Sequence, residues 1–144
     1  DITYIDDKGE KVRPVMLHRV IFGSIERFIG ILIEHFAGVF PLWLAPVQVK
    51  VLPVNNEYHL DYAKEVTELL KDKGFKVELD AREEKLGYRI REGQMEKVPY
   101  LLVLGNNERD EKTVTYRKHG EQKQITVPFD DFVAMLNQQI VDKK

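Results

Sequence analysis

Residues 100–104 read YLLVL, five apolar residues in succession with no polar residue between them. A strand with one face in water alternates apolar and polar residues, whereas a continuous apolar run is typical of a strand buried on both faces. A strand of that kind needs helices on both sides of its sheet. The stretch therefore predicts an α/β fold, with this strand in the interior of the sheet.

The segments on either side of YLLVL extend this prediction. Upstream, two strands (residues 47–52 and 75–79) alternate with two helices (59–73 and 86–96), and Gly74 follows the first helix as a left-handed cap would. Downstream, two short strands (113–117 and 124–127) flank the turn at His119 and Gly120, and a helix covers residues 129–141. We therefore expect a three-layer α/β sandwich over a mixed five-stranded sheet. In the helix at 59–73 we expect the buried face to hold Leu60, Ala63, Val66, Leu69 and Leu70.

Composition narrows the class of protein. The chain has 144 residues, 43% of them hydrophobic and 32% charged, with a formal net charge of −2 and no cysteine. No disulfide framework is available, and no stretch resembles a signal peptide or a membrane span. We therefore expect a globular cytoplasmic protein that makes no membrane contact. The charge argues against binding through a large basic surface but leaves room for a few arginine contacts to RNA.

The N-terminal part has a different pattern. Residues 1–16 predict a hairpin, residues 11–22 a strand, and residues 24–37 a helix with Ser24 as a candidate N-cap. The helix carries a continuous apolar stripe, which needs a covering surface. The joint at 38–46, GVFPLWLAP, contains prolines and a glycine that break helix and strand, yet its apolar side chains predict a packed connection. The stripe consists of Ile25, Phe28, Ile29, Leu32, Ile33 and Phe36, and the apolar residues of the joint are Phe40, Leu42, Trp43 and Leu44.

Residues 18–49, HRVIFGSIERFIGILIEHFAGVFPLWLAPVQV, closely resemble the third signature motif of class II aminoacyl-tRNA synthetases running into an anticodon-binding domain. His18 and the phrase FPLWLAPVQV are similar to the threonyl-tRNA synthetase family in particular. The resemblance extends over nearly all of the chain. It implies that residues 1–42 end an antiparallel catalytic domain, of which a strand and a helix remain, and that residues 43–144 are the anticodon-binding domain.

The resemblance also implies roles for three N-terminal residues. His18 matches one of three protein ligands of a catalytic zinc, whose other ligands, a cysteine and a histidine, would lie upstream. Arg27 matches the arginine that binds the ATP phosphates or adenine, as a guanidinium near a helix start suits an anion. Ser24 matches a position in the threonine and adenylate pocket, although a plain N-cap explains a serine there equally well.

In the C-terminal part, Arg91, Glu108 and Arg117 match positions that contact anticodon bases in this family. Glu83 matches a further such position but departs from the pattern, because an ionised carboxylate only accepts hydrogen bonds where an asparagine-like group is expected. From the residues alone, the mixed charges of the segment DAREEKLGYRIR at 80–91 are equally consistent with a solvated helix surface.

The resemblance therefore implies part of a dimeric threonine–tRNA ligase that uses ATP, Mg²⁺ and zinc to join threonine to its tRNA. We expect these 144 residues alone to be inactive, to bind no zinc and to contribute anticodon recognition. One rival is a non-catalytic synthetase-like RNA-binding or accessory module. The other is a small flavodoxin-like domain, which is disfavoured because the segment LPVNNEYHL after the first strand has no glycine-rich phosphate loop.

Overall fold

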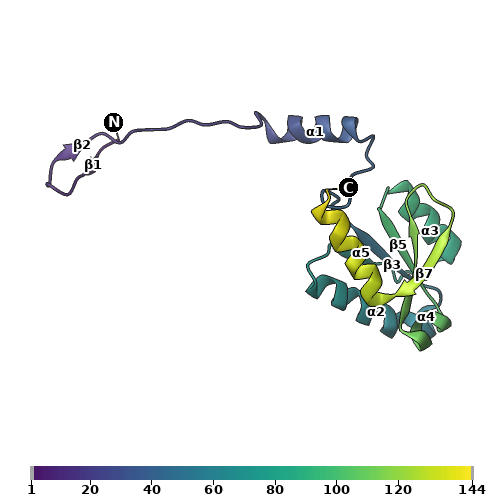
Figure 1. The fold of residues 1–144 in the computed structure, drawn as a ribbon. Helices are drawn as coiled ribbons and strands as arrows, with labels where there is room; N and C mark the ends of the chain where they lie inside the picture. The colour runs from purple at the N-terminus through teal and green to yellow at the C-terminus, as the bar shows by residue number, and fades with distance from the viewer. Residues whose placement is uncertain (1, 144) are drawn as a thin grey trace. The chain divides into compact units, whose positions relative to one another are not determined.

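The computed structural model describes residues 2–143 and divides the chain into two compact units, Asp1–Leu32 and Ile33–Lys144. The sheet lies in the second unit (Figure 1), with its strands in the spatial order β4-β3-β5-β6-β7. The strand β3 is parallel to β4 and β5, whereas β6 is antiparallel to β5 and β7. The strands are β3 (Val49–Pro53), β4 (Val77–Leu79), β5 (Tyr100–Leu104), β6 (Thr113–Lys118) and β7 (Gln124–Pro128).

The predicted mixed five-stranded sheet is thus confirmed, with β5, the YLLVL strand, at its centre and buried throughout. In flavodoxin-like folds all strands of the sheet are parallel. Here the chain reverses at β6 and again at β7, so the flavodoxin-like alternative is wrong.

Helices cover both faces of the sheet (Figure 1). The larger apolar cluster joins one face to α2 (Asn56–Asp72) and α5 (Phe129–Val141) through residues such as Val66 and Phe132. A smaller cluster joins the other face to α3 (Leu86–Met95), where Leu52 and Leu101 meet Ile90. Successive residues of a strand point to opposite faces, and for this reason neighbours such as Leu101 and Leu102 fall into different clusters.

Two helices differ from the sequence prediction. The helix α2 begins three residues early, because the Asn55 side chain accepts from the Glu57 N–H at 2.7 Å and acts as the N-cap. Leu69, expected on its buried face, is 41% exposed. The six-residue helix α4 (Asn106–Glu111) was not predicted at all, since its sequence, NNERDE, has no apolar periodicity.

In the first unit, the predicted hairpin is confirmed as β1 (Tyr4–Ile5) paired with β2 (Lys11–Val12). The turn is held by Asp6, whose Oδ1 accepts from Lys8 N and Glu10 N at 2.9 Å each. The prediction of a strand through residue 22 is wrong. A strand persists only where a neighbour pairs with it, and β1 offers two residues.

The helix α1 (Ile25–His35) forms where it was predicted, with slightly shorter bounds. None of its residues is buried, and Ile25 and Ile29 are 66% and 47% exposed. In the joint that follows, Leu42 is buried as expected and Ala45 is buried as well. Trp43 is 41% exposed, so its predicted burial is wrong. Among residues 2–143, no helix has the length and apolar character that crossing a membrane requires.

Candidate nucleic-acid interface

The carboxyl ends of the parallel strands β3, β4 and β5 meet at one edge of the sheet. The loops leaving β3 and β5 are joined by His59, which is 4% exposed. Its Nδ1 accepts from Asn55 N at 3.1 Å, so Nε2 carries the proton and donates to Asn106 Oδ1 at 2.9 Å. Sequence reasoning placed His59 only at the start of a helix and missed this role. The only sequence signal for this role was the position of His59, which comes shortly after the pair Asn55 and Asn56.

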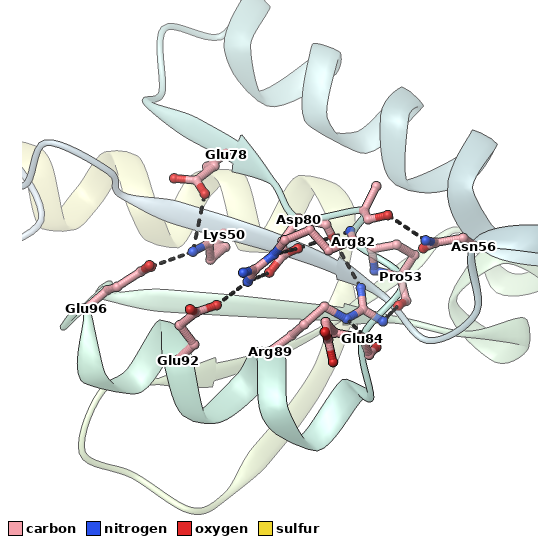
Figure 2. A network of polar contacts seen from close by, with 11 residues as sticks. Lys50, Pro53, Asn56, Glu78, Asp80, Arg82, Glu84, Arg89, Glu92 and Glu96 are labelled. Carbon is pink, nitrogen blue, oxygen red and sulfur yellow. Dashed lines mark hydrogen bonds and ion pairs between the residues drawn. The ribbon is translucent and has the colours of Figure 1, made fainter.

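The loop that follows β4, residues 80–85, is held by Arg89 from α3 (Figure 2). The Arg89 side chain is 2% exposed and donates only to backbone oxygens. The acceptors are Pro53 O at 2.8 Å, Asp80 O at 2.9 Å and Glu84 O at 3.1 Å. This one guanidinium therefore ties the ends of β3 and β4 to the loop through three hydrogen bonds.

A second arginine in the loop is also engaged by the protein (Figure 2). Arg82 donates through Nε and Nη2 to the two oxygens of Asp80 at 2.9 and 2.7 Å, and it pairs with Glu92 of α3. The hydrogen bonds from Arg82 lower the pKa of Asp80 against the opposing effect of burial, and they lower the pKa of Glu92 as well. Both carboxylates stay ionised at neutral pH, so Arg82 is neutralised locally.

At the other end of α3, Lys50 is 2% exposed and is likewise occupied (Figure 2). It pairs with Glu96 and, at 3.2 Å, with Glu78. Burial would lower the pKa of Lys50, but the two carboxylates outweigh that effect and raise it. Lys50 and Arg89 are therefore buried structural cations, whereas Arg82 is exposed but already paired with two carboxylates.

Glu83 is exposed in the same loop. It lines a hollow of about 310 Å³ together with Asn55, Asn56 and Arg82. The amide of Asn56, which also lines the hollow, donates to Ala81 O at 2.6 Å and is thereby fixed to the loop that carries Glu83. None of the other three residues predicted to contact anticodon bases lines this hollow.

Glu108 lies in α4 and is held from two sides. Its Oε2 accepts from Gly105 N at 2.8 Å, which caps the start of the short helix, and its Oε1 accepts from the Thr115 hydroxyl at 2.6 Å. Burial would raise the pKa of the Glu108 carboxyl, but the hydrogen bonds from Thr115 and Gly105 outweigh it and lower the pKa. Glu108 is thus an ionised acceptor with a fixed orientation.

Arg117 lies in β6, directly opposite Leu101 of β5. Residues directly opposite in an antiparallel pair point to the same face, and Leu101 packs toward α3. Arg117 is therefore on the α3 face, where its Nε donates to Glu121 O at 2.8 Å. By the same register Thr115 shares this face, and so do Gln124 and Thr126 of β7. We call Thr115, Arg117, Gln124 and Thr126 the open face, because Gln124 and Thr126 are exposed.

Arg91 is exposed on α3 beside this surface. It lies three residues before Gln94, and residues at that spacing share one side of a helix. The Gln94 Oε1 accepts from Gly120 N at 3.3 Å, in the turn between β6 and β7. The side of α3 that carries Gln94 and Arg91 thus faces the turn between β6 and β7. The fold brings Arg91, Glu108 and Arg117 to the open face, whereas Glu83 lies in its separate hollow.

The first unit contains the remaining predicted residues. Ser24 caps α1, since its Oγ accepts from Arg27 N at 3.4 Å, and it donates to Glu26 at 2.6 Å. The side chains of His18 and Arg27 are exposed. No group of three metal-ligating side chains lies within residues 2–143, so the residues that are described do not by themselves fit a zinc site.

Comparisons with known proteins show the family to which this fold belongs. The sequence model of the family described as "Anticodon binding domain" matches residues 48–139. Threonine–tRNA ligase of Geobacillus kaustophilus is 50% identical over 144 residues, and that of Clostridium tetani is 56% identical over 140. These alignments cover 100% and 97% of this chain but 22% of each ligase, so the chain spans about a fifth of the length of those relatives.

One solved structure extends the likeness to the fold. The RNA-binding domain of threonyl-tRNA synthetase from Cryptosporidium parvum Iowa II superimposes with a TM-score of 0.78 at 34% identity, covering 95% of this chain and 35% of that one. The family match over residues 48–139 includes all five strands of the sheet and the helices that pack on it, from β3 to most of α5. The chain therefore belongs to the anticodon-binding domain family, and over its whole length it is similar to part of the threonine–tRNA ligases.

Proposed function

We propose that this chain is part of a threonine–tRNA ligase and that residues 43–144 bind the anticodon loop of threonine tRNA on the open face. The observation that carries the proposal is the convergence of Arg91, Glu108 and Arg117 on one side of the sheet. Single-stranded RNA loops are recognised by stacking on arginine planes and by hydrogen bonds to base edges. Two arginines that supply donors, beside a carboxylate that accepts, match this kind of recognition.

Charge and packing support the same assignment. The two buried cations, Lys50 and Arg89, are engaged by carboxylates and by carbonyl oxygens, and the exposed Arg82 is paired with Asp80. This agrees with a net charge of −2 and an interface of few phosphate contacts. The side chain of Arg91 has no hydrogen bond or ion pair within residues 2–143, and the side chain of Arg117 donates only to the carbonyl oxygen of Glu121. Both guanidiniums therefore keep donors for a ligand. Glu83 would act as an additional acceptor from its hollow at the carboxyl edge.

The test is a fluorescence-anisotropy titration of the wild type, Arg91→Ala and Arg117→Ala with two RNA stem-loops. One loop carries the threonine anticodon and the other has altered anticodon bases. A bidentate arginine contact to a base contributes about 1–3 kcal/mol. Each substitution should therefore weaken binding of the threonine loop by roughly ten- to a hundredfold at fixed salt, and it should reduce discrimination against the altered loop.

Lys64→Ala is the matched control, because it removes one exposed positive charge from α2 on the other face of the sheet. A general electrostatic attraction would make all three substitutions weaken both loops to the same small extent. If the wild type and the two arginine variants bind both loops alike, the anticodon assignment is wrong.

The rest of the proposal concerns the longer ligase. We assign residues 1–42 to the end of its catalytic domain, where Ser24 and Arg27 would bind threonine and ATP and His18 would supply one zinc ligand among residues outside this chain. We expect that ligase to be a cytoplasmic homodimer requiring ATP and Mg²⁺, and the 144 residues alone to form no threonyl-tRNA. A filter-binding assay with radiolabelled threonine, ATP and tRNA measures the threonyl-tRNA formed. Product formed by the 144 residues would contradict the assignment of residues 1–42 to only the end of the catalytic domain.

A further inference from the structure

A chain of side-chain hydrogen bonds links Glu108 to the exposed strand β7. Thr115 and Thr126 are directly opposite in the β6–β7 pair, and their hydroxyl oxygens are 2.6 Å apart. The Thr115 oxygen is also 2.6 Å from Glu108 Oε1. Thr115 is 8% exposed, whereas Thr126 is exposed on the open face. The chain thus runs from a partly buried carboxylate through a buried hydroxyl to a hydroxyl in contact with solvent.

Counting protons fixes the direction of these bonds. A threonine hydroxyl has one proton to donate, and an ionised carboxylate has none. At 2.6 Å from Glu108, the Thr115 oxygen must direct its proton to the carboxylate, because two acceptors at that distance would repel each other. The contact between the two hydroxyls then needs the proton of Thr126. Thr126 donates to Thr115, and its remaining lone pairs are directed away from that bond.

Resting on the proposed function, we infer that Thr126 is a specificity-determining contact that accepts a hydrogen bond from an N–H group of an anticodon-loop base. The oxygen of Thr126 cannot donate to a base carbonyl or ring nitrogen without breaking its bond to Thr115. It therefore favours an exocyclic amino or a ring imino group. Arg117 lies on the same face, two residues along β6 from Thr115, the residue opposite Thr126, and its guanidinium offers only donors. The open face therefore presents an acceptor beside a donor.

The experiment pairs two variants with RNA analogues that lack single donors. Thr126→Val keeps the β-branched shape of an exposed strand residue but removes the oxygen, whereas Thr126→Ser keeps the hydroxyl. The probes are threonine anticodon stem-loops in which one loop base at a time loses an N–H group. For guanosine the replacements are inosine, which lacks the amino group, and 1-methylguanosine, which lacks the ring N–H. The others are nebularine for adenosine, zebularine for cytidine and 3-methyluridine for uridine.

We expect one replacement to weaken binding to the wild type by about three- to tenfold, the range for one hydrogen bond, and to have no further effect on Thr126→Val. Thr126→Val should bind the unmodified loop more weakly by the same factor, and Thr126→Ser should behave as the wild type. This pattern is the coupling that a direct contact produces in a double-mutant cycle. A structural role for Thr126 would instead weaken all loops equally.

The outcomes also separate this inference from the proposed function. If Arg117→Ala weakens binding but every analogue affects the wild type and Thr126→Val equally, Thr126 makes no base contact and only this inference fails. If the wild type binds no stem-loop, the proposed function fails and the inference fails with it.

Discussion

Arg89 shows how a charged side chain can serve the architecture of an interface without contacting a ligand. Its guanidinium is buried and donates to three carbonyl oxygens. Pro53 O is at the end of β3 and Asp80 O directly follows β4, where the sheet no longer supplies a partner. Glu84 O is in the loop that carries Glu83, just before α3. Because an arginine offers five donors in a rigid plane, one side chain satisfies three acceptors that converge from different segments.

This arrangement leads to a prediction at the scale of one residue. Arg89→Met keeps the length of the side chain but leaves buried carbonyl oxygens without partners, at about 1–3 kcal/mol for each group that water cannot reach. We expect the free energy of unfolding to fall by about 2–5 kcal/mol, measured by urea denaturation. Arg91→Met on the same helix is the control and should change it by less than about 0.5 kcal/mol. Equal effects of the two substitutions would contradict the assigned role of Arg89.

At the scale of elements, the close approach of α3 to the sheet depends on a helical glycine. Gly93 is buried against Leu101 of β5, and a Cβ added there would lie 2.7 Å from Leu101 Cδ2. Leu101 is itself fully buried, so it has no space into which to move. The position of α3 relative to the sheet places Arg91 beside the open face, so this contact matters for the proposed RNA site.

The corresponding prediction compares two glycines of α3. Gly93→Ala should destabilise the protein by about 1–3 kcal/mol, as overpacking in a core does. Gly87→Ala adds a methyl group where nothing lies within 4 Å, and it should stabilise by about 0.5–1 kcal/mol because alanine is the better helix former. Thermal unfolding followed by circular dichroism measures both changes. Stabilisation by both substitutions would mean that α3 is not packed closely on β5.

For the whole molecule, the core defines which part of the chain folds independently. The larger cluster extends from Leu42 to Leu136, and Leu42 also accepts at its carbonyl from Gln48 Nε2 at 2.9 Å. None of residues 2–41 is buried. The joint at residues 42–45 is thus part of the folded domain, although the sequence resemblance placed the start of that domain at residue 43 and the family model matches only from residue 48.

Two truncations test this boundary. Residues 38–144 should unfold within about 1 kcal/mol of the full chain, because they keep every buried side chain. Residues 47–144, which we also expect to fold, lose Leu42 and should be less stable by about 2–3 kcal/mol. Urea denaturation of the three proteins provides the comparison. Equal stability of the two truncated proteins would show that Leu42 contributes nothing to the core.

Local sequence patterns were enough to predict the strands of the five-stranded sheet, its longer helices and the family. Apolar runs and helical periodicity predicted five strands and the helices at 59–73, 86–96 and 129–141, because these signals depend on neighbours a few residues apart. The motif around residues 18–49 and the family positions selected Arg91, Glu108 and Arg117. Their roles in binding remain predictions.

Which of these residues lie together depends on how the chain packs in three dimensions. Strand order and register placed Thr126 opposite Thr115 and both within reach of Glu108, and they separated Glu83 from the open face. Burial made Arg89 a structural residue and left Arg91, two positions away, exposed. Local sequence patterns carry no record of such contacts, because they join residues far apart in the chain whose pairing depends on the packing of the whole sheet.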